Sequence, residues 1–97
     1  MLYTINKSPI MFRNLESCLE VAPPGDPILL YEDGVYAAVA GAETESLMNE
    51  VVEQHPVYVL DADLQARGLT RLVSGVEVVG YERFVDLVVE HNVVSWL

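Results

Sequence analysis

Short apolar stretches separated by turn residues recur along the chain and predict a series of strands. The first stretch, residues 2–5, favours a strand that stops near Asn6 and Lys7, because Ser8 before Pro9 is biased towards extended geometry. The continuous apolar run from Pro27 to Tyr31 is typical of a strand buried on both faces. Later strands are predicted at 57–60, 76–79 and 93–97, the last of them at a sheet edge.

Between these predicted strands, apolar residues recur with the spacing of a helix. In the first interval Asn14 is a predicted N-cap, and Pro23-Pro24-Gly25 ends the helix. One stripe of this helix holds Leu15, Cys18, Leu19 and Ala22. In the second interval a helical segment begins at Val35, pauses at Gly41 and resumes over 44–54, which fits two short helices or one broken helix.

Two further helices are predicted in the second half of the chain. Asp61-Ala62-Asp63 stands where an N-cap is expected, Gly68 stops the helix, and residues 70–74 favour an additional turn. The clearest amphipathic helix covers 81–91. Its predicted inward residues are Phe84, Val85, Val88 and Val89, and its predicted outward residues are Glu82, Arg83, Asp86 and Glu90.

Strands that alternate with helices over short connections indicate parallel pairing, with helices on both faces of the sheet. We therefore predict a single α/β domain over residues 1–97, built on an open, mostly parallel sheet of four to five strands. Ligands and active residues in such sheets gather beyond the carboxyl ends of the strands. The polar residues expected there are Asn6, Lys7, Ser8, Glu32, Asp33, Asp61 and Asp63.

Composition narrows the classes of partner. Fifteen acidic against five basic residues give a formal charge of -10, which argues against direct binding of nucleic acid or of an anionic membrane. No apolar run approaches the roughly 20 residues that span a bilayer, and no signal peptide is recognisable, so a cytoplasmic protein is expected. With 52% hydrophobic residues in so short a chain, an oligomer is favoured.

Cys18 is the only cysteine and the only strong nucleophile of the chain. Its stripe with Leu15 and Leu19 favours an inert, buried thiol, whereas a helix start near Lys7 and Arg13 would lower the thiol pKa and favour a reactive one. Both alternatives stay open at the level of sequence.

The remaining polar residues have simpler explanations. The carboxylates at the strand ends could surround a hard cation, but helix capping explains them as well. His55 and His91 lack zinc-ligand spacing, and the isolated glycines match no phosphate-binding loop, so no metal or cofactor is predicted. Trp96 would complete the edge of the core or anchor a partner.

Four stretches, taken in order and spacing, resemble the TusB/DsrH family. They are Leu2-Tyr3-Thr4-Ile5-Asn6-Lys7-Ser8-Pro9, Leu15-Glu16-Ser17-Cys18, Glu32-Asp33-Gly34-Val35-Tyr36-Ala37-Ala38 and Asp63-Leu64-Gln65-Ala66-Arg67-Gly68. Trp96 near the end also fits, and Cys18 resembles the DsrH branch most closely.

The resemblance implies a DsrE/DsrF/DsrH-like fold and a subunit of a heterohexameric sulfur-relay complex that moves sulfur as cysteine persulfide without a cofactor. It implies sister subunits of TusC/TusD or DsrE/DsrF type, of which TusD or DsrE holds the principal sulfur-carrying cysteine. The implied acceptor is of TusE/DsrC type, and the end use is tRNA wobble 2-thiouridine formation or oxidation of stored sulfur. Cys18 is the position that carries over as a persulfide carrier, and a purely structural scaffold subunit is the alternative.

Overall fold

Five parallel strands form one open sheet in this computed structural model, which describes residues 1–97. The strands are β1 (Leu2–Ile5), β2 (Ile28–Leu30), β3 (Val57–Leu60), β4 (Val76–Val79) and β5 (Val93–Trp96). Their order across the sheet is β4-β3-β2-β1-β5, and every neighbouring pair is parallel. The predicted α/β fold class is confirmed, and so is the place of the last strand at an edge.

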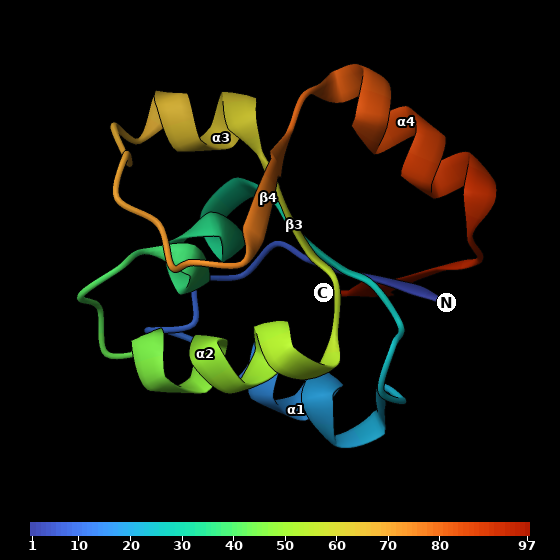
Figure 1. The fold of residues 1–97 in the computed structure, drawn as a ribbon, viewed down its shortest axis with the longest axis horizontal. Helices are drawn as coiled ribbons and strands as arrows, with labels where there is room; N and C mark the ends of the chain where they lie inside the picture. Colours follow the sequence, from blue (N-terminus) through green and yellow to red (C-terminus); the bar gives the residue numbers. More distant parts are fainter.

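Helices cover both faces of this sheet. They are α1 (Asn14–Val21), the 3-10 helix η1 (Glu32–Ala38), α2 (Glu45–Gln54), α3 (Asp61–Ala66) and α4 (Tyr81–Glu90). Figure 1 shows α1 and α2 side by side below the sheet and α4 on the opposite side. Two separate helices, η1 and α2, lie between β2 and β3, which was one of the two predicted alternatives. None of the helices has the length and apolar composition needed to cross a membrane.

The pleat of the strands divides the core into two clusters, because successive side chains point to opposite faces. Tyr3, Ile5 and Leu30 belong to a larger cluster of 16 buried residues, which also receives side chains from α1, η1, α2 and α3. The smaller cluster, on the α4 side, consists of Leu2, Leu29, Val79 and Leu87. Most of the apolar core thus lies on one side of the sheet.

Both predicted N-caps are wrong by one position. Asn14 is already the first residue of α1, and its Nδ2 donates to the backbone oxygen of Trp96 at 3.3 Å instead of capping the helix. Asp61 is likewise the first residue of α3, and its Oδ2 accepts a bond from Nε2 of Gln65 at 2.7 Å. In each case another donor or acceptor competes successfully for the side chain that was expected to cap.

The helical turn predicted over residues 70–74 is also wrong. Leu72 forms an isolated antiparallel bridge with Val39, and the N–H of Val73 donates to the oxygen of Ala38 at 2.8 Å. This segment therefore extends along the end of η1. Its backbone hydrogen bonds go to a distant part of the chain, so a local turn has no advantage.

Helix α4 begins and ends close to the prediction but faces the sheet differently. Leu87 is buried and Phe84 packs beside it, whereas Val85, Val88 and Val89 are 54%, 38% and 79% exposed. The prediction of these three valines as inward residues is wrong. The apolar arc of the helix is wider than its contact with the sheet, and Leu87 occupies the space above Leu29, which leaves the other half of the arc outside.

Candidate functional site

Polar side chains that follow three neighbouring strands meet at the carboxyl end of the sheet. Nδ2 of Asn6, after β1, lies 3.4 Å from Oε1 of Glu32, which follows β2. The backbone N–H of Glu32 in turn donates to Oδ2 of Asp63, in α3, at 2.7 Å. The predicted gathering of Asn6, Glu32 and Asp63 is confirmed. Oδ1 of Asn6 is buried and has no hydrogen-bond partner.

The start of η1 passes directly against β1. The N–H of Tyr31 donates to the oxygen of Ile5 at 3.1 Å, and Glu32 adopts a positive φ of 47°. A Cβ atom on Gly34 would collide with that same carbonyl oxygen of Ile5, so only glycine fits there. This role of Gly34 was not predicted from the sequence. The available signal was a glycine four residues after the end of the fully buried strand β2.

Arg67 links the two acidic segments at this edge. Its Nη2 lies 2.9 Å from Oδ1 of Asp33, and its Nη1 donates to the backbone oxygen of Asp63 at 3.1 Å. The structure contains no group of three or more His, Cys, Asp or Glu side chains that could hold a metal ion. The carboxylates of Asp33 and Asp63 instead accept bonds from a guanidinium and from a backbone N–H. The helix-capping role predicted for the strand-end carboxylates is not found in α3, which has no side-chain cap.

Loop 7–13, which joins β1 to α1, presents three large apolar side chains to solvent. Ile10, Met11 and Phe12 are 70%, 75% and 48% exposed. The ammonium of Lys7 lies 5.4 Å from the centre of the Phe12 ring, and Arg13 pairs with Glu16 on the surface. Two of the five basic residues of the chain therefore flank an exposed apolar loop. Such a patch is typical of a contact surface.

Cys18 belongs to the larger core cluster. Its side chain is fully buried under α1, and burial raises the pKa of the thiol to about 11. At neutral pH only about one molecule in 10⁴ then carries the thiolate, which is the nucleophilic form. Arg13, whose charge was expected to lower the pKa, is engaged with Glu16 instead. The geometry resembles that of an inert structural cysteine.

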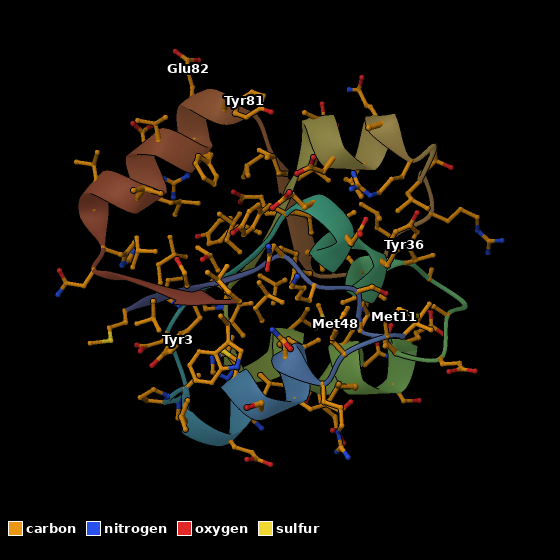
Figure 2. All side chains as sticks on the ribbon, turned by 180° about the vertical axis from the view of Figure 1, so that it is seen from behind. Tyr3, Met11, Tyr36, Met48, Tyr81 and Glu82 are labelled. Carbon is orange, nitrogen blue, oxygen red and sulfur yellow. The ribbon has the colours of Figure 1, made fainter.

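The other singled-out residues have structural contacts. The imidazole of His55 is buried, and its Nδ1 lies 2.9 Å from the backbone oxygen of Asp26. Nδ1 therefore carries the proton, because a carbonyl oxygen only accepts. The ring of Trp96 packs edge-on against Tyr3, with 6.3 Å between the ring centres, so Trp96 completes the edge of the core. Figure 2 shows Tyr3 beside α1.

A groove of about 380 Å³ runs between the end of α1 and α2. Its walls are Leu19, Ala22, Pro24, Leu47, Glu50, Val51, Gln54 and His55. Since Pro24 precedes β2 and His55 precedes β3, the groove lies at the amino ends of the strands, far from the polar network at their carboxyl ends. Neither Cys18 nor any residue of the polar network lines the groove.

Known proteins resemble this chain along nearly its whole length. The family model for the DsrH like protein matches residues 7–94. The Protein TusB of Serratia proteamaculans (strain 568) is 41% identical over 99 residues, which cover 99% of this chain and 100% of that protein. The Protein TusB of Pectobacterium carotovorum subsp. carotovorum (strain PC1) is 40% identical over 93 residues, 94% of each chain.

A solved structure agrees in fold. The ychN protein from E. coli superimposes with a TM-score of 0.80 over 97% of each chain at 16% identity, which supports the fold alone. The sequence matches go further, because they combine about 40% identity with nearly complete coverage of both chains. On these grounds the chain belongs to the TusB/DsrH family.

Proposed function

We propose that this chain is a subunit of a sulfur-relay complex that passes persulfide sulfur to an acceptor of TusE/DsrC type. The observation that carries the proposal is the match with TusB proteins, which covers 99% of this chain and 100% of the Serratia relative. The partners are sister subunits of TusC/TusD or DsrE/DsrF type. The exposed apolar loop 7–13, beside the carboxyl ends of the strands, supports a role that depends on contacts with other proteins.

The transfer step needs a thiolate and nothing else. The thiolate of the receiving protein attacks the outer sulfur of a donor persulfide, a new sulfur–sulfur bond forms, and the donor cysteine leaves as a thiolate. No electrons are gained or lost overall. A cysteine that takes part must be accessible and have a pKa near the ambient pH.

Cys18 meets neither condition in the closed fold, since it is fully buried and its pKa is raised to about 11. This favours the alternative in which the chain is a scaffold that shapes the complex and leaves the chemistry to a sister subunit. The carrier role of Cys18 stays a prediction. It requires α1 to move away from the sheet before sulfur can reach the thiol.

Mass measurement of the assembled complex distinguishes the two roles. The three chains are co-purified, loaded with a persulfide donor and separated, and each chain is weighed. The scaffold role predicts added sulfur on a sister chain and none on this one, and full transfer to the acceptor by a Cys18→Ala complex. Sulfur on the wild-type chain that disappears in Cys18→Ala, together with slower transfer, would instead establish Cys18 as a carrier.

As the end use we propose tRNA thiolation, because the family resemblance implies this use for the TusB branch, and relatives about 40% identical to this chain carry the name TusB. Deletion of the gene should then remove 2-thiouridine from the wobble position of tRNA, and a plasmid copy should restore it. The measurement is nucleoside analysis of digested tRNA. Unchanged 2-thiouridine combined with a defect in oxidation of stored sulfur would assign the chain to the other branch.

A further inference from the structure

The outward half of α4 is the most apolar helix surface that the fold leaves uncovered. Tyr81, Val85, Val88 and Val89 are 63%, 54%, 38% and 79% exposed, and we call these four residues the outer face of α4. Residues spaced by three and four lie on one side of a helix, so the four side chains form a continuous strip. Figure 2 shows Tyr81 beside Glu82 at the upper end of this helix, where it begins.

The outer face cannot turn inward, because the opposite side of the helix is already fixed. Leu87 is buried against the sheet, and Phe84 packs against the same cluster. The guanidinium of Arg83 lies 5.8 Å from the ring centre of Tyr58 and 3.4 Å from Glu90. Rotation of α4 would bury the valines only by exposing Leu87, so the strip remains available to another molecule.

The strip continues to the edge of the sheet. Val93, four residues after Val89 and at the start of β5, is 39% exposed. β5 pairs only with β1, so its other edge has no strand neighbour. A partner that covers the outer face of α4 therefore also reaches a free strand edge, which offers backbone hydrogen bonds.

The acidic residues beside the strip indicate which kind of molecule binds this surface. Glu82, Asp86 and Glu90 follow one another along the helix and border the strip, and all three are exposed. The one cation of the helix, Arg83, is turned towards Tyr58. A second copy of this chain would bring the same acidic border and a further charge of -10. Like charges at an interface are unfavourable, so the fitting partner is a different chain with Lys and Arg around an apolar patch.

We propose that the outer face of α4 binds a sister subunit of the relay complex, through an apolar surface on that subunit which is bordered by basic residues. This inference rests on the proposed function for the identity of the complex. Burial of Tyr81 and the three valines supplies the affinity. The acidic border supplies orientation and a faster, salt-dependent association.

The test is assembly of the co-expressed chains, measured by native mass spectrometry and by light scattering after gel filtration. The Val85→Glu/Val89→Glu variant should weaken assembly at least about 100-fold, because two charges would be buried without partners. Val21→Glu is the matched control, since Val21 is 57% exposed on α1, outside the strip. This control should change assembly by less than about threefold. Denaturation of each variant alone verifies that it is folded.

A second variant tests the charge of the partner. Glu82→Lys/Asp86→Lys should slow association and reduce its dependence on salt. Faster association of this variant would overturn the basic border, and a wild-type chain that forms its own oligomer through the strip would overturn the choice of partner. If the Val85→Glu/Val89→Glu chain still assembles fully, the surface is wrong although the proposed function stands. If the wild-type chain does not assemble with sister subunits at all, the proposed function fails as well.

Discussion

The two faces of the sheet bury different amounts of apolar side chain. On one face, 16 buried residues from β strands, α1, η1, α2 and α3 form a continuous core that includes Cys18. On the other face only four buried residues meet, and the helix above them leaves three valines in solvent. The closed face holds the fold together, whereas the α4 face has spare apolar surface. A small chain in which both faces were equally closed would have less apolar surface to offer a partner.

The largest effect should come from the closed face, at the contact between η1 and β1. Gly34→Ala should lower the free energy of unfolding by about 4 kcal/mol or more, because a Cβ would meet the carbonyl oxygen of Ile5 and the backbone would have to move. The comparison is Gly80→Ala at the start of α4, where a Cβ meets no atom within 4 Å and a change within about 1 kcal/mol is expected. Urea titrations with equal losses for both variants would contradict the difference between the faces.

Adjacent leucines of β2 provide a direct comparison, because both are fully buried and they point to opposite faces. Leu30 belongs to the larger cluster and Leu29 to the smaller one. Leu30→Ala should cost about 3 to 4 kcal/mol, and Leu29→Ala about 2 kcal/mol, since α4 can settle into the space more easily than the closed core can. Chemical denaturation measures both. A larger loss for Leu29→Ala would mean that the α4 face is the tighter of the two.

Cys18 should make the closed face sensitive to alkali. Burial raises the pKa of its thiol from an ordinary value of 9.0 to about 11, so the unfolded chain loses this proton at lower pH than the folded chain. The stabilising contribution of the buried neutral thiol is fully present below about pH 9 and is lost as the pH rises from about 9 to 11. Thermal unfolding at a series of pH values should show this decline in the wild type and a smaller one in Cys18→Ala.

Burial also raises the pKa values of Tyr3 and Tyr31, so part of the alkaline decline above about pH 10 should persist in the variant. Identical profiles for the wild type and Cys18→Ala between pH 9 and 10 would show that the thiol is more accessible than its buried position indicates. That result would strengthen the prediction of Cys18 as a sulfur carrier.

The smallest effect is expected on the outer face of α4. Val89→Ser should change the free energy of unfolding of the isolated chain by no more than about 0.5 kcal/mol, because the side chain is 79% exposed. Leu87→Ala, two residues earlier on the same helix, should cost about 2 kcal/mol. Calorimetry of both variants tests the orientation of α4. A large loss for Val89→Ser would restore the orientation predicted from sequence.

The strands were predictable because their signal is local. The runs 57–60 and 76–79 coincide with β3 and β4. Of the stripe predicted for the first helix, Leu15, Cys18 and Ala22 are buried and Leu19 is half-buried. The orientation of α4 was not predictable. Its apolar positions extend around half of the helix, and only the shape of the sheet below determines that Leu87 enters the core and Val89 does not.

The candidate site was predictable in part. Its location followed from the parallel sheet, and its residue types followed from the strand ends. The hydrogen bonds within the site could not be predicted from the sequence, because they join distant segments. The bond from Glu32 N–H to Asp63 spans 31 residues, and the bond from Arg67 to Asp33 spans 34. The close approach of Gly34 to Ile5 also depends on two strands that are far apart in the sequence. The stripe that includes Cys18 correctly favoured burial, but the thiol pKa depended on the packed core.

The position of β1 between β2 and β5 determines when the sheet can be completed during synthesis. Thr4 lies opposite Ser95, 91 residues later, so β1 cannot pair with β5 until residues 93–96 have been synthesised. Until then an almost entirely apolar strand has an unpaired edge, which is prone to aggregation. The nascent chain therefore acquires its native pairing only when residues 93–96 have emerged from the ribosome.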